Sequence, residues 1–294
     1  MSTPTASGAA AGESRSFGSR LADVIDERGA LCVGIDPHAY LLADWGLNDD
    51  AAGARELGLR VVDAAAGRAG IVKPQVAFFE RFGAAGYAAL EEVLAAARAA
   101  GLLVIADVKR GDVGSSVAAY GQAWLTPGAP LEADAMTISA FQGVDSLREP
   151  IALAAASGKG LFVLAATSNP EAADIQTSRN VVSGVSVARA IIEDVTQANA
   201  AIGHEAGPVG VVLGATLDLH AFGIDTSTPN EPALPVLAPG FGHQGARLAD
   251  ARDIYGELAG MLVVSESRSI LSAGPGQIAG IIDARASEVR SALV

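Results

Sequence analysis

The sequence predicts an α/β protein of the (β/α)₈ barrel class, the TIM barrel, built as a single domain. Eight short apolar runs occur along the 294 residues, and a helical pattern or a segment of helical length follows each of them. The runs are continuously apolar rather than alternating, as expected for parallel strands covered by helices on both faces. A doubly wound open sheet has the same order of elements, so the count leaves that alternative open.

The strand candidates are spread through the whole chain beyond its first thirty residues. Between them, apolar residues spaced three and four apart predict helices around residues 57–64, 90–97 and 187–195. Residues 21–25 predict an additional helix before the first strand, and residues 278–294 predict one after the last. The predicted strands are residues 31–35, 70–73, 102–107, 135–138, 161–164, 209–213, 236–238 and 261–264.

The composition excludes several classes of partner. Lys and Arg number 20 against 33 Asp and Glu, and the net charge of −13 argues against nucleic acid, which needs a basic face. No run approaches the ~18 apolar residues of a membrane span, so we expect no membrane partner. The single cysteine, Cys32, excludes an intramolecular disulfide and a cysteine-rich zinc site, and it fits a cytoplasmic location. Residues 1–16 are small and polar, and they predict a disordered tail before a barrel domain of residues 17–294.

Polar residues gather at the carboxyl ends of six of the predicted strands, where barrels carry their catalytic groups. A single polar strand end usually only solvates the rim of a barrel. Six that converge on one face predict a binding site. The six segments are residues 34–38, 73–75, 107–113, 167–170, 239–245 and 265–268.

The third predicted strand leads into the most informative set, Asp107, Lys109 and Asp112. Asp107 and Lys109 are two residues apart, so their side chains lie on the same side of the strand. Carboxylates favour the charged form of a lysine, which predicts a fixed cation and proton donor rather than a Schiff-base nucleophile. Asp112 follows in a glycine-containing loop and either turns back or reaches a partner subunit. An ion-pair network on the rim is the alternative for this set.

The loops after the seventh and eighth strands predict a phosphate site. Gly240, Gly242 and Gly245 allow backbone N–H groups to approach an anion, and Arg268 adds a bidentate clamp. The same glycines spell G-x-G-x-x-G with Glu266 about twenty residues later, as in a dinucleotide fingerprint. Too few residues follow Glu266 to complete a dinucleotide domain, so we favour the phosphate site. The four histidines show no metal-ligand spacing, and we expect neither a metal nor a cofactor.

Residues 106–115, Ala-Asp-Val-Lys-Arg-Gly-Asp-Val-Gly-Ser, closely resemble the signature of the orotidine 5′-phosphate decarboxylase family. Residues 135–146 and the Thr-Ser-Asn-Pro stretch at 167–170 are most similar to a longer bacterial branch that includes the mycobacterial enzymes. The resemblance covers nearly the whole chain beyond the tail. The other segments that resemble this family, in order, are residues 34–38, 72–74, 167–170, 238–245 and 267–270.

The resemblance implies the cofactor-independent decarboxylation of orotidine 5′-phosphate to UMP and CO₂, the last step of de novo UMP biosynthesis, by a homodimer. It implies that Lys109 stabilises and protonates C6 of the pyrimidine, and that Asp107 lies near the scissile carboxylate. It also implies that Asp112 and Ser116 come from the neighbouring subunit. The remaining residues implied by it are Asp36 and Lys73 at the ribose, with Lys73 also in the charge network, Ser168 at the pyrimidine, and Gly242, Gln244, Gly245 and Arg268 at the phosphate.

Two other functions remain open on the residues alone. A metal-dependent sugar-phosphate aldolase or synthase on the same barrel would gather carboxylates on a metal ion, which Lys109 would crowd. A non-catalytic phosphonucleotide-binding module would keep Gln244 and Arg268, but it would not need a lysine between Asp107 and Asp112.

Overall fold

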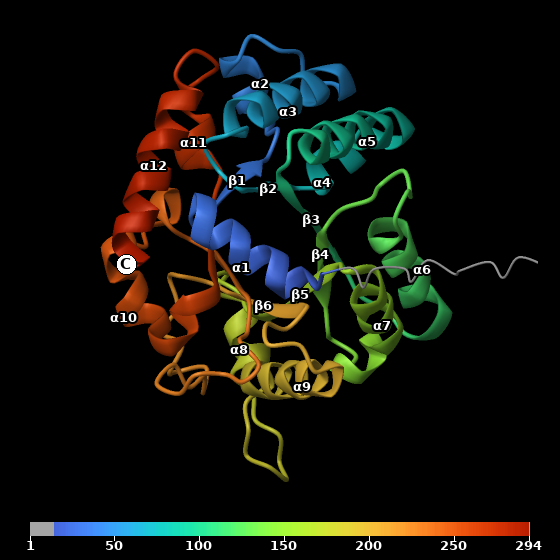
Figure 1. The fold of residues 1–294 in the computed structure, drawn as a ribbon, viewed down its shortest axis with the longest axis vertical. Helices are drawn as coiled ribbons and strands as arrows, with labels where there is room; N and C mark the ends of the chain where they lie inside the picture. Colours follow the sequence, from blue (N-terminus) through green and yellow to red (C-terminus); the bar gives the residue numbers. More distant parts are fainter. Residues whose placement is uncertain (1–14, 294) are drawn as a thin grey trace, which may run out of the picture.

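The computed structural model describes residues 15–293, in which eight parallel strands close into a barrel in sequence order (Figure 1). The pairing of β8 with β1 excludes the doubly wound open sheet and confirms the predicted (β/α)₈ barrel. The strands are β1 (Leu31–Ile35), β2 (Ile71–Pro74), β3 (Leu103–Arg110), β4 (Ala135–Ser139), β5 (Gly160–Ala166), β6 (Val209–Leu213), β7 (Val236–Pro239) and β8 (Leu262–Glu266).

Helices surround the barrel and connect most of the consecutive strands (Figure 1). The connection from β6 to β7 is different, because residues 214–235 form turns and contain no α-helix. The α-helices are α1 (Phe17–Arg28), α2 (Ala39–Asp44), α3 (Ala51–Ala65), α4 (Ala77–Glu80), α5 (Gly83–Ala99), α6 (Gly114–Leu125), α7 (Arg148–Ser157), α8 (Ala172–Gln176), α9 (Val187–Ile202), α10 (Ala251–Tyr255), α11 (Arg268–Leu271) and α12 (Ile278–Leu293).

All eight predicted strands are present, and the third is longer than predicted. β3 continues to Arg110, past the predicted end at Asp107. Its pairing with β4 shifts in register between Ala106 and Arg110. Irregular pairing of this kind bends a strand and redirects its side chains. The charged residues at this end of β3 therefore belong to the sheet and not to a loop.

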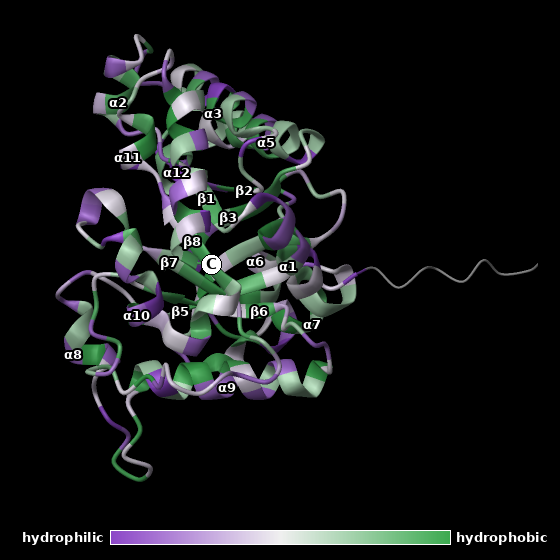
Figure 2. Cartoon of the chain, turned by 60° about the vertical axis from the view of Figure 1, so that its left-hand side comes forward, coloured by the Kyte–Doolittle hydropathy of each residue, from purple (hydrophilic) through white to green (hydrophobic). Residues whose placement is uncertain are grey.

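Two apolar layers hold the barrel together. One lies inside it and contains inward-facing residues such as Cys32, Ile71, Ile105 and Val263. The larger one fills the space between the strands and the surrounding helices. Figure 2 shows mainly hydrophobic strands at the centre and hydrophilic residues toward the outside of the helices. Because side chains alternate along a strand, the residue two positions beyond an interior apolar residue also faces inward.

The additional N-terminal helix, α1, closes one end of the barrel, where Figure 1 shows it lying across the strands. Phe17 and Leu21 are fully buried and belong to the interior layer. The Phe17 ring packs edge-on against Phe162, with ring centroids 5.9 Å apart. It fills the space over Gly160, where an added Cβ would lie 2.3 Å from the ring. The helix is therefore a plug of the barrel interior.

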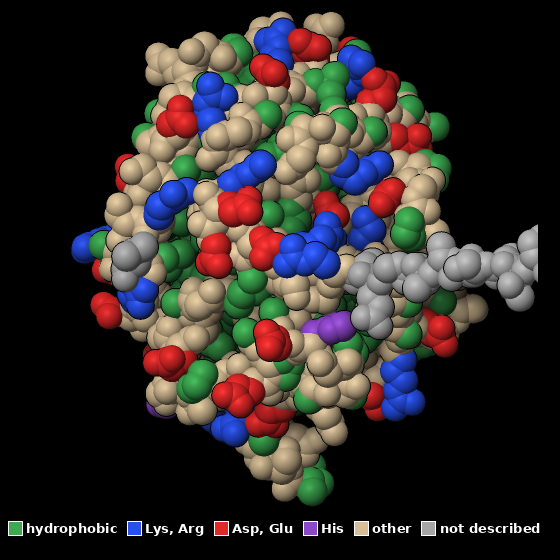
Figure 3. Space-filling view, in the orientation of Figure 1, with side chains coloured by type: hydrophobic (Ala, Val, Ile, Leu, Met, Phe, Trp, Pro, Cys, Tyr) green, Lys and Arg blue, Asp and Glu red, His purple; other side chains and the backbone are tan. Residues whose placement is uncertain are grey.

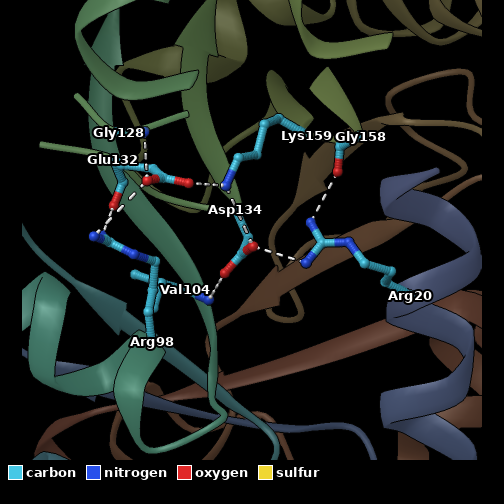
Figure 4. Close-up of polar contacts among 8 residues, drawn as sticks. All are labelled: Arg20, Arg98, Val104, Gly128, Glu132, Asp134, Gly158 and Lys159. Atoms are coloured by element: carbon cyan, nitrogen blue, oxygen red, sulfur yellow. Dashed lines mark hydrogen bonds and ion pairs between the residues drawn. The ribbon is translucent and has the colours of Figure 1, made fainter. Parts of the chain in front are cut away.

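Ion pairs fasten α1 to this end of the barrel (Figure 4). Arg20 donates hydrogen bonds to Asp134 Oδ1 and to the Gly158 carbonyl oxygen, both at 2.8 Å. The buried Lys159 Nζ lies 2.7 Å from Glu132 Oε1 and 3.7 Å from Asp134 Oδ1. On the surface seen in Figure 3, around α1, charged side chains of both signs are interspersed. Lys159 and Asp134 thus have partners of opposite sign, which their desolvation requires.

The predicted disordered tail, residues 1–16, lies outside the described residues except for Arg15 and Ser16. Ser16 is buried, and its hydroxyl accepts a hydrogen bond from the Ser19 N–H, so it is the N-cap of α1. Ser16 therefore belongs to the helix rather than to a tail. In the part of the chain that the structure describes, no helix has the length and apolar character needed to cross a membrane.

Phe17→Ala is expected to lower the free energy of unfolding by about 3–5 kcal/mol, because it leaves a cavity between α1 and the barrel interior. Urea denaturation followed by circular dichroism would measure this loss. Ile175→Ala is the control, since Ile175 is 55% exposed. That substitution is expected to cost about 0.5 kcal/mol or less. Equal losses in the two variants would show that α1 does not plug the barrel.

Candidate active site

A cavity of about 410 Å³ opens at the carboxyl end of the barrel, within the size range of small-molecule sites. The structure brings residues from all six predicted polar strand ends together at this cavity. No group of three or more His, Cys, Asp or Glu side chains suited to a metal ion occurs among the described residues. The predicted site residues that line the cavity are Asp36, Lys73, Asp107, Lys109, Ser168, Gly240, Gln244 and Arg268.

The alternation of side chains along the strands places the charged residues directly above the interior apolar layer. Lys73 follows the interior residue Ile71 by two positions on β2, and both are buried. Asp107 follows Ile105 in the same way on β3. The charges of the site therefore rest on an apolar floor. Surroundings of low polarity strengthen their mutual attraction.

Asp107 is a buried carboxylate that four side chains hold. Lys73 Nζ lies 2.6 Å from Asp107 Oδ2, and Gln75 Nε2 donates to the same oxygen at 2.9 Å. Lys109 Nζ lies 2.5 Å from Oδ1, to which Thr137 Oγ1 donates at 2.9 Å. Each oxygen of the Asp107 carboxylate thus has two donors. The four donors together fix the orientation of this carboxylate.

Mutual attraction keeps this group ionised in spite of its burial. Burial opposes the charge on Asp107, but the ammonium groups of Lys73 and Lys109 outweigh it and hold the pKa of the carboxyl well below its usual range. Burial also opposes the charge on Lys73, while Asp107 and Asp36 raise the pKa of Lys73 well above its ordinary value. Asp107 and Lys73 are therefore both charged at neutral pH.

Lys109 has a strained backbone. Its φ of 52° is the only positive value of a non-glycine residue in the part of the chain that the structure describes. This conformation costs about 1–2 kcal/mol, and such strain is concentrated at functional sites. The Lys109 N–H donates to Thr137 Oγ1 at 3.0 Å, which fixes the strained segment to β4. The Lys109 side chain is 45% exposed, against 8% for Lys73, so its ammonium group faces the open cavity.

Two buried oxygen atoms of cavity residues have no hydrogen-bond partner among the described residues, Asp36 Oδ1 and Ser267 Oγ. Buried polar atoms are nearly always paired, so both atoms are available to a ligand. A free carboxylate oxygen accepts a hydrogen bond from a hydroxyl group such as those of a sugar. Ser267 lies beside Arg268, at the end of the cavity where the sequence predicts a phosphate site.

The loop after β7 depends on its glycines, since Gly240, Gly242 and Gly245 have φ values of 121°, 69° and 103°. Ser168 donates to Gln244 Oε1 at 3.2 Å and links this loop to the one that follows β5. The N–H groups of Gly242 and Gly245 donate to carbonyl groups of the loop itself. Neither of these two glycines lines the cavity within the described residues. Their contact with a phosphate stays a prediction.

Asp112 and Ser116 lie outside the cavity. Asp112 Oδ1 accepts a hydrogen bond from the Val113 N–H at 2.8 Å, and Ser116 is an exposed residue of α6. In the described chain no hydrogen bond or ion pair joins either residue to Lys109. Their expected place in the site of a neighbouring subunit stays a prediction.

Gln75, Thr137 and Ser267 line the cavity, but no individual role is predicted for them from the sequence. Gln75 stands in one of the predicted polar strand ends, so its position was visible but its bond to Asp107 was not. Thr137 had a usable signal, because it is a polar residue at an inward position of β4, two residues after the interior Ala135. Ser267 also stands in a predicted polar strand end, residues 265–268, but its unpaired hydroxyl is visible only in the structure.

The fold and the site define a (β/α)₈ barrel with a buried lysine–aspartate centre and a glycine loop at the mouth of its cavity. Residues 29–279 match the family model described as orotidine 5′-phosphate decarboxylase / HUMPS family, and the chain belongs to this family. It is 47% identical to the orotidine 5′-phosphate decarboxylase of Salinispora tropica over 280 residues, which cover 95% of this chain and 98% of the relative. It is 49% identical to that of a Nocardioides species over 262 residues, which cover 87% and 91% of the two chains.

Solved structures of related proteins share the fold. One from Streptomyces avermitilis, provisionally assigned as an orotidine 5′-phosphate decarboxylase, is 45% identical with a TM-score of 0.88, and the match covers 95% of this chain and 96% of that one. Leishmania donovani OMP decarboxylase is 30% identical with a TM-score of 0.76, and the match covers 95% and 99% of the two chains. The family that residues 106–115 resemble is therefore confirmed.

Thr137→Val is expected to lower kcat about tenfold or more, because Asp107 loses one donor and the strained Lys109 N–H loses its acceptor. Steady-state decarboxylation assays would measure kcat, and circular dichroism would show that the barrel is intact. Thr228→Val is the matched control, since Thr228 is an exposed loop residue away from the cavity. A kcat within about twofold of the parent enzyme would show that the Thr137 bridge does not hold the charged group.

Proposed function

We propose that this enzyme converts orotidine 5′-phosphate to UMP and CO₂ without a cofactor, with Lys109 as the proton donor. The observation that carries the proposal is the fixed arrangement of Lys73, Asp107 and Lys109 in the cavity. Decarboxylation breaks the bond between C6 and the carboxylate and leaves an electron pair on C6. A cation held at that carbon stabilises the developing charge. The Lys109 ammonium then forms the C6–H bond, and the lysine takes a proton back from solvent.

Asp107 contributes to this reaction in two ways. It holds the Lys109 ammonium at 2.5 Å, so the cation does not have to reorganise as charge develops. In the proposed complex it also lies near the substrate carboxylate, and this repulsion disappears when CO₂ leaves. A pair of unit charges about 4 Å apart contributes about 4 kcal/mol at an effective dielectric constant of about 20, or roughly a thousandfold in rate. Rate acceleration beyond this contribution of one charge pair is expected from preorganisation of the site and from substrate binding energy.

The other residues of the cavity bind the substrate away from the reacting carbon in this proposal. The unpaired Asp36 Oδ1 and the Lys73 ammonium suit the ribose hydroxyls, and Ser168 suits the pyrimidine. Gln244 and Arg268 bind the phosphate, with a contribution from the glycine loop. Binding energy gained at the phosphate is then available to hold the pyrimidine against the reacting cation.

We also propose that residues 17–294 act as one decarboxylase domain, and that two copies form a homodimer with shared sites. The position of Asp112 and the exposure of Ser116 support this arrangement, since neither residue lines the cavity of its own chain. In a two-fold dimer both could enter the partner's site. For the location we propose the cytoplasm, in keeping with the one cysteine, Cys32, which is buried and free.

Lys109→Ala is expected to lower turnover about a hundredfold or more, while UMP binding changes by no more than about threefold, because Lys109 acts on a charge that the product lacks. The loss of orotidine 5′-phosphate absorbance would measure turnover, and calorimetry would measure UMP binding. Arg148→Ala is the control, since Arg148 is an exposed residue outside the cavity. A Lys109→Ala enzyme that keeps more than about a hundredth of the activity would remove Lys109 from the reaction.

Mixing inactive Lys109→Ala and Asp112→Ala subunits is expected to restore activity if the site is shared. An equal mixture forms about half mixed dimers, each with one site that carries both lesions and one that carries neither, so about a quarter of all sites regain both residues. Activity would be assayed after subunit exchange, which native mass spectrometry would verify. If both residues act within one chain, every site keeps a lesion, and no activity returns.

A further inference from the structure

Glu266 is a buried carboxylate at the phosphate end of the cavity, and the proposed reaction does not use it. It is the last residue of β8, is 2% exposed, and lines the cavity together with Ser267 and Arg268. Its Oε2 also faces the loop after β7, where a Cβ added to Gly242 would lie 3.2 Å from it. A phosphate bound between this loop and Arg268 would therefore have a buried acid nearby. Low polarity makes such a repulsion strong.

Arg285 of α12 compensates this carboxylate. Arg285 Nε donates to Glu266 Oε2 at 3.0 Å, and Nη2 donates to Oε1, so the ion pair is bidentate. Ser269 Oγ adds a third donor, at 2.6 Å from Oε2. Burial opposes the charge on Arg285, but its hydrogen bonds and its attraction to Glu266 raise the pKa of the guanidinium. Glu266 is thus fully engaged on the side of the barrel that faces α12.

Arg268, unlike Arg285, has an unpaired side chain among the described residues. It lies two residues beyond Glu266 and lines the cavity, but its side chain has no hydrogen bond or ion pair with any residue that the structure describes. An uncompensated Glu266 would attract this guanidinium, because both side chains reach the same end of the cavity. The presence of Arg285 removes that competition.

We infer that the Glu266–Arg285 ion pair is a positioning element of the phosphate subsite. Arg285 binds the Glu266 carboxylate and compensates its charge, so Arg268 stays free to bind the phosphate, and the phosphate does not meet an uncompensated buried anion. Arg285 also pairs with Glu288, whose side chain is 54% exposed to solvent. This inference rests on the proposed assignment of the substrate phosphate to Arg268.

Arg285→Met, Glu266→Gln and the double variant test the inference through inhibition constants for UMP and for uridine. Arg285→Met is expected to weaken UMP about tenfold or more with little change for uridine, since only the phosphate meets the exposed carboxylate. Glu266→Gln is expected to leave UMP binding unchanged or tighter. The double variant is expected to regain most of the UMP affinity that Arg285→Met loses. If the pair only supports the fold, both ligands weaken in each single variant and the double variant recovers nothing, which overturns the inference.

Two control variants, Arg189→Met and Arg268→Ala, separate failure of the phosphate assignment from failure of the inference about Glu266 and Arg285. Arg189→Met removes a matched arginine that pairs with Glu193 on α9, outside the cavity, and is expected to change neither constant. If Arg268→Ala leaves the ratio of UMP to uridine affinity unchanged, the phosphate assignment itself fails. If Arg268→Ala lowers that ratio and Arg285→Met does not, only the present inference fails. Should Arg285→Met not fold, Glu266→Gln decides, because about tenfold weaker UMP binding in that variant would contradict the inference.

Discussion

A carboxylate buried at the end of a closed barrel must be compensated, and Asp107 imposes this requirement on the whole site. Alone it would take up a proton or destabilise the fold, so two ammonium groups and two neutral donors surround it. The dependence is mutual, because the same carboxylate keeps the buried Lys73 charged. The cation at the centre of the cavity is therefore held by the forces that stabilise the fold. It needs no rearrangement when a charge develops beside it.

At both ends of the barrel interior buried charges need partners, but the partners are complete at only one end. At the end closed by α1, Phe17 fills the interior, and Asp134 and Lys159 are paired with other side chains of the chain. At the other end pairing is incomplete, because Asp36 Oδ1 has no partner among the described residues and the Lys109 ammonium faces open space. Buried charges have partners of opposite sign in both places. The unpaired oxygen atoms at the carboxyl end of the barrel are available to a ligand.

Most of the fold could be predicted because apolar runs and helical spacing are local patterns. Barrel closure was predicted from the count of eight strands, but the count does not decide it, since an open doubly wound sheet has the same order of elements; the pairing of β8 with β1 decides between them. The end of β3 was misjudged for a related reason. The apolar run stops at Asp107, although the spacing of Asp107 and Lys109 already placed Lys109 on the strand, and pairing of Arg110 with Ile138 of β4 extends the strand to Arg110. Contacts with a neighbouring strand outweigh the preference of the local sequence.

The types of residue that form the site could be predicted from the sequence. Their contacts in space could be predicted only in part. The spacing of Asp107 and Lys109 predicted that they lie on one side of β3, and they are in contact. The strained backbone of Lys109 and its bond to Thr137 depend on β4, which no spacing within β3 contains. Glu266 shows the same limit, because in the sequence it resembles the acid of a nucleotide fingerprint, whereas in the structure it binds Arg285 of α12. A charged residue thus indicates a function only once its partner is known. In a closed barrel, packing between distant segments determines that partner.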